Sequence, residues 1–310
     1  MDKNKPNIIF MGTPEFSVPV LEMIHKELGV AAAVTIPDKP KGRGRKLQSS
    51  AVKSAAIEMG IPLLQPEKLK DENFRNELAA FQPDIIVVVA FRILPALIFN
   101  LPSIGTFNIH ASLLPKYRGA APINWAIING ESKTGLTTFL IEEKVDTGNI
   151  LLQDKINLHN DCTAGDLHNI MMPRAAKIGL DTCNLLLSGE YELKEQDDSQ
   201  ASPAPKLFPS QATIDWTMPS DKVKNFINGF SPFPGSRTKW NGKMLKILRA
   251  EHAGHISLNP GEYKITKTGF YVCCGDGAIK ITELQQEGKK PVNVEAFLNG
   301  YRGEKHGHFD

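Results

Sequence analysis

The sequence predicts an α/β protein with a mostly parallel, Rossmann-like sheet that carries helices on both faces, followed by a smaller β-rich domain. In the first half of the 310 residues, short apolar runs alternate with helix signals, as in a parallel sheet joined by crossover helices. The run DIIVVVA at 84–90 is apolar without a break, which is typical of a strand covered on both faces. Beyond residue 209 the chain changes to short strands, glycines and turns such as Asn241-Gly242.

The individual elements follow from apolar runs and their boundary residues. Apolar and β-branched runs predict strands at 7–11, 30–36, 62–65, 84–90, 105–110, 134–141 and 149–158. Thr13 fits an N-cap and Pro14 fits the first helical position, so a helix is expected to start there. Further helices are expected between Ser50 and Gly60 and over 67–81, 121–130 and 163–187, the last with a kink at Pro173.

A change in composition separates the two predicted domains. Residues 190–198 are acidic and polar, and 199–209 contain three prolines, which indicates a linker. We therefore expect an α/β domain over 1–189, a linker over 190–208 and a small β-rich barrel or sandwich over 209–310.

Composition and charge indicate the general class of protein but do not specify its function. The chain is 41% apolar and 23% charged, with a net charge of +2, as in ordinary soluble globular proteins. Residues 209–310 carry 14 Lys or Arg against 10 Asp or Glu, a net charge of +4, which permits a polyanionic partner without demanding one.

The lengths of the apolar runs and the spacing of the cysteines indicate the cellular compartment and the redox state of the thiols. The apolar run before Gly12 is too short for a signal peptide, and IIVVVAF at 85–91 is far too short to span a membrane. The four cysteines show no paired framework and no Cys-x-x-Cys. We expect a cytoplasmic protein with reduced thiols and no metal site, in which the His306 and His308 tail is solvated.

Two nucleotide-binding patterns are missing from the sequence. The turn after the first strand, Gly12-Thr13-Pro14-Glu15-Phe16, lacks the Gly-x-Gly-x-x-Gly of dinucleotide enzymes. No Gly-x-x-x-x-Gly-Lys phosphate loop occurs. These absences argue against a nicotinamide-dependent dehydrogenase and against nucleotide hydrolysis.

The stretch FNIHASLLPKYRGAAP at 107–122 carries the chemistry of interest. In a strand, Asn108 and His110 lie on one face about 7 Å apart, at the carboxyl edge where open α/β sheets bind ligands. An amide can donate to a developing oxyanion, and an imidazole can move a proton near neutral pH. An isolated Asn-x-His more often satisfies backbone groups at a strand end.

Two further segments extend this candidate site. Asp146 lies in EEKVDTGNI, between two predicted strands, where its carboxylate could orient the imidazole and favour its charged form. The segment Ser112, Leu113, Leu114 and Pro115 offers backbone groups and an apolar rim suited to a flat heteroaromatic ligand. Taken alone, each of these segments would be only a loop.

The motif FNIHASLLPKYRGAAPINWAI together with VDTGNIL resembles the folate-dependent formyltransferases. The resemblance implies that Asn108, His110 and Asp146 are the catalytic trio. It also implies that residues 112–115 line the site of 10-formyltetrahydrofolate, the formyl-donor substrate.

Other segments resemble one branch of that family, the methionyl-tRNA formyltransferases. They are KPKGRGRKL at 39–47, IDW at 214–216 and FSPFPGS at 230–236. The resemblance implies a C-terminal oligonucleotide-binding-fold-like barrel that holds initiator methionyl-tRNA, in agreement with the positive charge of 209–310. It also implies that the basic loop enters the acceptor stem.

The basic loop also has a direct physical reading. Its cations can meet backbone phosphates: Lys41, Arg43, Arg45 and Lys46. Among these, we expect Arg43 to make the main contact.

The chain departs from the family pattern after the fourth predicted strand, where family members often have Tyr-Gly. It has Ala90-Phe91-Arg92 there, which leaves the role of Arg92 open.

Three other functions remain alternatives to a methionyl-tRNA formyltransferase. They are a formyltransferase for an amino sugar or glycinamide ribonucleotide, a formyltetrahydrofolate hydrolase, and a non-catalytic RNA-binding protein. We expect a monomer.

Overall fold

The computed structural model of the protein describes residues 5–41, 46–254, 256 and 258–309. Contacts between residues divide the chain into two compact units, each assembled from separate stretches of sequence. The first unit is made of Met1–Gly119, Gly135–Ile156 and Asn169–Pro203, and the second of Ala120–Thr134, Asn157–His168 and Ala204–Asp310. The long helix α6 (Ala164–Ser188) contributes residues to both units.

A seven-stranded sheet forms the middle of the first unit, in the order β10-β9-β7-β6-β1-β2-β5. β1 pairs in parallel with β2 and β6, β6 with β7, and β2 with β5, whereas β9 is antiparallel to β7. The predicted mostly parallel sheet is therefore confirmed. Its strands are β1 (Ile8–Gly12), β2 (Ala32–Val34), β5 (Leu63–Leu64), β6 (Ile85–Val89), β7 (Gly105–His110), β9 (Lys133–Leu140) and β10 (Ile150–Asn157).

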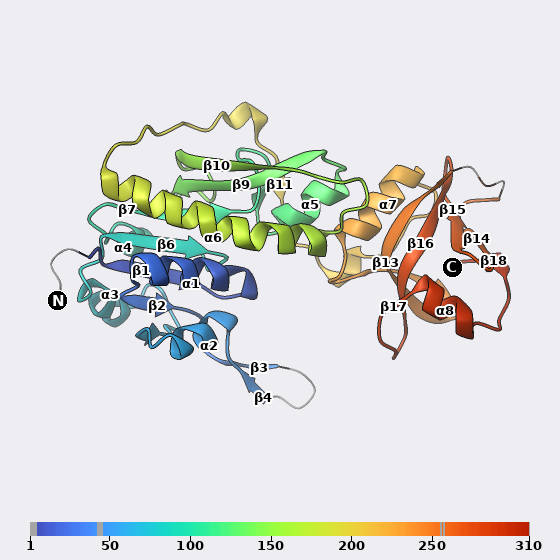
Figure 1. Ribbon diagram of the computed structural model, residues 1–310, viewed down its shortest axis with the longest axis horizontal. Helices are drawn as coiled ribbons and strands as arrows, with labels where there is room; N and C mark the ends of the chain where they lie inside the picture. The colour runs from blue at the N-terminus through green and yellow to red at the C-terminus, as the bar shows by residue number, and fades with distance from the viewer. Residues whose placement is uncertain (1–4, 42–45, 255, 257, 310) are drawn as a thin grey trace. The chain divides into compact units, whose positions relative to one another are not determined.

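Helices cover both faces of this sheet, as expected. On one face, the side chains of Ile86 and Val88 join a buried cluster with Phe74 of α3 and Ile98 of α4. On the other face, a β-carbon at Gly179 of α6 would lie 2.9 Å from side-chain atoms of Ile109 and of Val20 in α1, so α6 packs closely there. Figure 1 shows α6 running along the sheet. The helices are α1 (Val18–Glu27), α2 (Ala51–Glu58), α3 (Glu72–Ala79) and α4 (Ala96–Phe99).

The first helix begins later than predicted. Instead of an N-cap at Thr13, the chain forms a short 3-10 helix, η1 (Glu15–Ser17), and α1 starts at Val18. The hydroxyl of Ser17 does not cap α1 but donates a 2.8 Å hydrogen bond to the carbonyl of Val89, at the end of β6. A hydrogen bond to β6, a neighbour of β1 in the sheet, thus takes the place of the side-chain cap that Ser17 could have made. The predicted start of α2 is confirmed, because Ser50 accepts from the Lys53 N–H.

The basic loop forms a hairpin that the sequence did not predict. β3 (Lys39–Lys41) pairs antiparallel with β4 (Lys46–Gln48), and Lys41 lies opposite Lys46. Figure 1 shows this hairpin extending away from the sheet of the first unit. Further short elements are β8 (Arg118–Gly119), β11 (Pro203–Ala204), η2 (Asp198–Gln200) and η3 (Pro209–Gln211).

An antiparallel sheet dominates the second unit, in the order β12-β13-β16-β15-β14-β18, with β17 paired to β16. The pairing of β13 with β16 shifts register at three points, and interruptions of this kind bend and twist strands, as a curled half-barrel requires. The predicted C-terminal β-rich, barrel-like domain is confirmed. Its strands are β12 (Ser236–Trp240), β13 (Lys243–Gly254), β14 (Glu262–Ile265), β15 (Phe270–Cys273), β16 (Ala278–Gln286), β17 (Val292–Asn293) and β18 (His306–His308).

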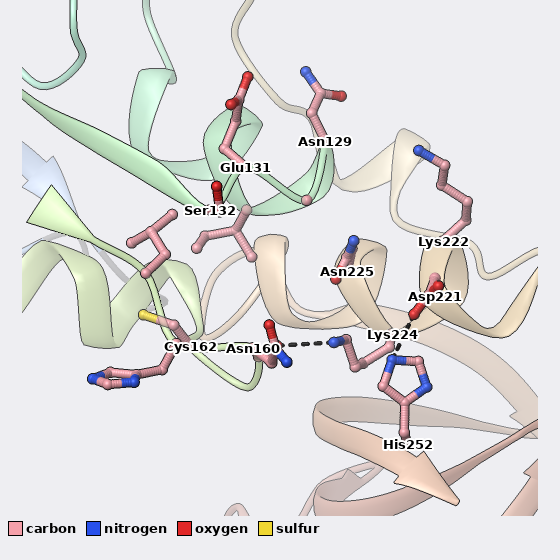
Figure 2. Close-up of a pocket in the computed structure, with 14 residues that line it drawn as sticks. Asn129, Glu131, Ser132, Asn160, Cys162, Asp221, Lys222, Lys224, Asn225 and His252 are labelled. Carbon is pink, nitrogen blue, oxygen red and sulfur yellow. Dashed lines mark hydrogen bonds and ion pairs between the residues drawn. The ribbon is translucent and has the colours of Figure 1, made fainter. Parts of the chain in front are cut away.

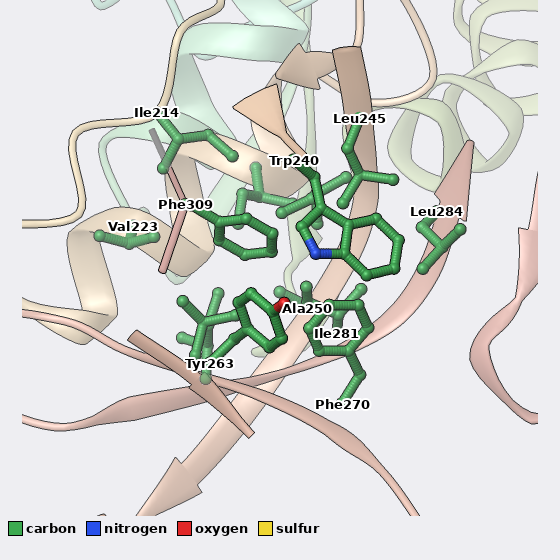
Figure 3. Close-up of a cluster of buried hydrophobic side chains, with 14 of the residues drawn as sticks. Ile214, Val223, Trp240, Leu245, Ala250, Tyr263, Phe270, Ile281, Leu284 and Phe309 are labelled. Atoms are coloured by element: carbon green, nitrogen blue, oxygen red, sulfur yellow. The ribbon is translucent and has the colours of Figure 1, made fainter. Parts of the chain in front are cut away.

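Aromatic side chains fill the interior of this half-barrel. The Trp240 ring lies 5.7 Å from Phe270 and 6.0 Å from Tyr263, centroid to centroid. Figure 3 shows Trp240, Tyr263, Phe270 and Phe309 converging between the strands. The predicted turn at Asn241-Gly242 joins β12 to β13, with positive φ at both residues, as a tight two-residue hairpin requires.

Helices complete the second unit: α5 (Pro122–Ile128), α7 (Ser220–Gly229) and α8 (Val294–Gly300). The amide of Asn124 in α5 donates to the carbonyl of Gly229 in α7 at 2.8 Å. A β-carbon at Gly229 would collide with the side chain of Ile128, so glycine permits this close approach of α5 and α7.

All four cysteines are buried free thiols, as expected from their spacing. Burial raises the pKa of Cys162 to about 11 and that of Cys183 and Cys274 to about 12. These side chains are therefore protonated and unreactive at neutral pH.

Candidate active site

Asn108 and His110 lie at the carboxyl end of β7, as the sequence predicts. Asn108 stands in register with Val88 of β6, whose side chain belongs to the cluster beneath α3 and α4. By alternation, Asn108 and His110 point toward that face, and Ile109 points toward α1 and α6. Asn108 is half-buried and His110 is 6% exposed, so the pair combines a reachable amide with a sheltered imidazole.

The two ring nitrogens of His110 have different surroundings. Nε2 lies 2.8 Å from the carbonyl oxygen of Tyr117. Because a carbonyl only accepts, Nε2 must carry a proton and donate it. Nδ1 lies 3.8 Å from Oδ2 of Asp146, too long for a hydrogen bond but close enough for electrostatic attraction. The structure therefore brings His110 and Asp146 together and leaves Nδ1 as the ring atom available to a ligand.

Asp146 is held firmly although it lies in a loop. Its backbone φ is +58°, a left-handed conformation that is uncommon for residues other than glycine. Its Oδ2 accepts a 2.8 Å hydrogen bond from the N–H of Gly119. At Gly148, two residues on, a β-carbon would collide with the carbonyl of Leu140, which explains the Asp-x-Gly spacing. The turn thus fixes the carboxylate beside the imidazole.

Hydrogen bonds from neighbouring strands fix the segment 112–115. The hydroxyl of Thr137 donates to the carbonyl of Ser112 at 2.7 Å and accepts from the N–H of Leu114 at 3.1 Å. The Gln153 amide donates to the carbonyl of Leu114 at 2.9 Å. The backbone of this turn is therefore preorganised by β9 and β10.

The four side chains of this segment divide into two pairs. Ser112 is fully buried, and its hydroxyl donates to the carbonyl of Lys116 at 2.6 Å. Leu114 is 4% exposed and packs with Phe139. Leu113 and Pro115 are half-buried and form the accessible surface of the turn.

Arg92 is directed toward a neighbouring loop. Its Nη2 donates to the carbonyl of Pro66 at 2.9 Å and its Nη1 to that of Glu67 at 3.0 Å. The guanidinium also lies over the ring of Phe91, 5.2 Å from the centroid. Partial burial lowers the pKa of Arg92. Arg92 thus links the loop after β6 to the loop after β5. This is a structural role that the sequence alone did not assign to it.

The basic residues of the hairpin are only partly described. Lys41 and Lys46 are paired in the β3–β4 ladder, whereas Arg43 and Arg45 lie outside the described residues. At the base of the hairpin, Lys53 Nζ contacts Asp38 Oδ2 at 2.8 Å. This hydrogen bond lowers the pKa of Asp38 and ties the hairpin to α2.

The second unit contains a polar cavity of about 350 Å³ that the sequence did not predict. Figure 2 shows Lys224 reaching toward Asn160, and Asp221 paired with His252. Lys224 is 4% exposed and its Nζ donates to the carbonyl of Asn160 at 2.9 Å. His252 Nε2 lies 2.6 Å from Asp221 Oδ1. No local motif marks this cavity, because its lining comes from distant stretches of sequence.

The described residues contain no group of three or more His, Cys, Asp or Glu side chains placed to hold a metal ion. Over the same part of the chain, no helix combines the length and apolar character needed to cross a membrane.

Both parts of the chain match described protein families. The family described as "Formyl transferase" matches residues 6–183. The family described as "Formyl transferase, C-terminal domain" matches residues 206–302. Together these matches cover most of the chain.

Curated relatives resemble the chain over nearly its full length. A methionyl-tRNA formyltransferase of Geobacter sulfurreducens is 45% identical, covering 95% of this chain and 94% of that protein. A methionyl-tRNA formyltransferase from Caldanaerobacter subterraneus is 44% identical, covering 95% of this chain and 96% of that protein. In fold, the chain is similar to an N-formyltransferase from Helicobacter canadensis, solved with folinic acid and dTDP-3-aminofucose. That likeness has a TM-score of 0.69 at 22% identity, over 91% of this chain and 99% of the other. The chain belongs to the formyltransferase family and, within it, to the methionyl-tRNA formyltransferases.

Proposed function

We propose that the protein transfers the formyl group of 10-formyltetrahydrofolate to the α-amino group of methionine on initiator methionyl-tRNA, for translation initiation. The observation that carries this proposal is that Nδ1 of His110 lies 3.8 Å from Oδ2 of Asp146, while Asn108 lies on the same face of β7 as His110. The full-length relatives named methionyl-tRNA formyltransferase support it. We also propose a cytoplasmic, monomeric enzyme.

In the proposed reaction, the amine nitrogen attacks the formyl carbon, and the bond from that carbon to the folate nitrogen breaks. The half-buried amide of Asn108 donates to the oxyanion that develops on the formyl oxygen. The attacking amine loses one proton and the departing folate nitrogen gains one, so protons balance.

The environment of His110 supports different proposed roles for its two nitrogens. Nε2 is occupied by the carbonyl of Tyr117, so Nδ1 is the atom that stabilises the developing charge and delivers a proton. Asp146 stabilises the charged imidazole and assists removal of the proton from the incoming amine.

Substrate binding is divided among several parts of the chain. We propose that Ser112, Leu113, Leu114 and Pro115 form the folate-facing turn, in which Ser112 and Leu114 hold the shape and Leu113 and Pro115 make contact. Lys41, Arg43, Arg45 and Lys46 would meet phosphates of the acceptor stem. In functional terms, 1–189 is the catalytic domain, 190–208 connects, and 209–310 binds tRNA through its net positive charge.

A formyl-transfer assay tests this proposal. The enzyme would receive 10-formyltetrahydrofolate with methionyl initiator tRNA, and in parallel with glycinamide ribonucleotide or a nucleotide-linked amino sugar. Formylation of the tRNA alone is the expected result. Transfer only to a small amine would keep the chemistry and overturn the tRNA assignment, and release of formate without an acceptor would indicate a hydrolase.

A further inference from the structure

A strap of chain, residues 194–202, is bonded to the candidate site from outside its sequence motifs. Its start forms an antiparallel bridge between Lys194 and Ile150, with hydrogen bonds of 2.8 and 3.0 Å. Its end is fixed by the N–H of Arg118, which donates to the carbonyl of Ser202 at 2.9 Å. From composition this stretch is part of a linker, yet it is bonded at both ends within the first unit.

Gln196 is the buried centre of the strap. It is 8% exposed, and its Nε2 donates to the carbonyls of Asp146 at 3.0 Å and Gly148 at 2.8 Å. Its Oε1 accepts from Arg118, from Nη2 at 2.8 Å and from Nε at 3.2 Å. Nη2 of Arg118 also contacts Asp198 of the strap at 2.7 Å. Both donors and both lone pairs of the Gln196 amide are therefore used, as a buried amide requires.

The strap also forms a hydrogen bond with Tyr117, the residue whose carbonyl is bonded to the imidazole of His110. The backbone N–H of Tyr117 donates to the hydroxyl of Ser202 at 3.0 Å. The carbonyl of the same Tyr117 accepts from Nε2 of His110. Tyr117 and Asp146 both have left-handed backbones, with φ of +62° and +58°. This conformation is unfavourable for residues other than glycine and persists only where the surroundings hold it. The strap bonds to both.

We propose that Gln196 and Ser202 are positioning residues, which set the relation of His110 to Asp146 by holding the turns at Tyr117 and Asp146. This inference rests on the proposed function, because it gives the pair a catalytic role. Without Gln196, the turn at 146–148 loses both hydrogen bonds that span it from the strap. Displacement of a catalytic group by about 1 Å can cost on the order of 10²-fold in rate.

The test compares two substitutions at Gln196. One removes only the NH2 donor of the amide, and the other removes both the donor and the acceptor oxygen. Gln196→Glu keeps the acceptor for Arg118 but sets a carboxylate against the carbonyls of Asp146 and Gly148. Gln196→Met removes both halves at similar volume. The matched control is Gln200→Ala, an exposed glutamine of the same strap whose side chain donates to Asp197.

We expect both Gln196 variants to lose about 10- to 100-fold in kcat, with KM for folate and for tRNA within about two-fold of wild type. Gln200→Ala should match wild type in every measurement. A kcat loss that only parallels the unfolded fraction, measured by thermal denaturation, would give Gln196 a purely structural role and overturn the inference. Ser202→Ala provides a second, milder variant with the same expected pattern.

A double-mutant cycle with Asp146→Asn separates the two proposals. If Gln196 acts through Asp146, Gln196→Met should cost little further activity in the Asp146→Asn background. Fully multiplicative losses would overturn the positioning role while leaving the proposed function intact. Wild-type turnover in Asp146→Asn alone would instead contradict the role that the proposed function gives to Asp146.

Discussion

Oδ2 of Asp146 lies 3.8 Å from Nδ1 of His110 and accepts a 2.8 Å hydrogen bond from the N–H of Gly119. The carboxylate is therefore anchored independently of the imidazole, and no hydrogen bond is needed to keep the two side by side. With Nε2 bonded to the carbonyl of Tyr117, Nδ1 is the ring nitrogen left for a ligand.

Asn108→Ala should lower the turnover of formyl transfer by roughly 10²–10³-fold, because it removes one donor to the developing oxyanion. KM for folate should change little, since the interaction strengthens only in the transition state. Steady-state kinetics measure both quantities. Asn100→Ala, an exposed asparagine after α4, is the control. A variant that kept near-normal turnover would remove Asn108 from the trio.

Arg43→Ala should weaken tRNA binding and flatten its dependence on salt, by about 0.9 in the slope of log K against log salt for one lost phosphate contact. Folate affinity should not change. Binding titrations at several salt concentrations measure this, with Lys26→Ala, an exposed cation on α1, as the control. Equal damage to folate and tRNA binding would point to misfolding instead.

Gly148→Ala should reduce both turnover and thermal stability, because a β-carbon there would collide with the carbonyl of Leu140. Overpacking of this kind costs about 1–3 kcal/mol and would displace the turn that carries Asp146. Gly300→Ala is the control, because its β-carbon would meet no atom within 4 Å. If Gly148→Ala kept wild-type kcat and Tm, the turn would be more tolerant than its packing indicates.

Asp166→Asn should lower Tm in a pH-dependent way. Thr163 and Asp166 form a capping box at the start of α6, and Arg249 Nη2 contacts Asp166 Oδ2 at 2.6 Å. Burial alone would raise the pKa of Asp166, but hydrogen bonds from the Thr163 N–H and Arg249 lower it below its ordinary value of 3.8. The ionised carboxylate thus stabilises the folded state above that value, and the contribution is lost as pH falls through the lowered pKa.

The measurement is the difference in Tm between Asp166→Asn and wild type at a series of pH values. It should be largest near neutral pH, where loss of the cap and ion pair costs about 1 kcal/mol, and should fade below about pH 4. Glu58→Gln, which alters an exposed carboxylate without a partner among the described residues, is the control. A difference that grew on acidification would have the wrong sign for this account.

Much of the fold was predictable because its signals are local. The run at 84–90 and the alternation through Asn108 and His110 depend only on neighbouring residues, and both lie in strands as expected. The start of α1 and the β3–β4 hairpin were missed. At Ser17 a bond to Val89 replaced capping, and the Lys- and Gly-rich composition of 39–47 gave no strand signal.

The candidate site was predictable only where one motif held its members. The contact between His110 and Asp146 was expected, although the catalytic roles of both remain predictions. Gln196 was not found, because its amide bonds to groups 50 and 78 residues away in sequence, and nothing in EYELKEQDD distinguishes it. Such contacts exist only after the sheet has formed.

The proposed role of His110 is tested by the rate at which His110→Ala transfers formyl groups to methionyl initiator tRNA, measured beside folate binding by titration. We expect a loss of roughly 10²–10⁴-fold in turnover with folate binding retained, because in the proposed reaction the imidazole acts on the reacting groups rather than on substrate affinity. Near-normal turnover in a folded His110→Ala protein would contradict it.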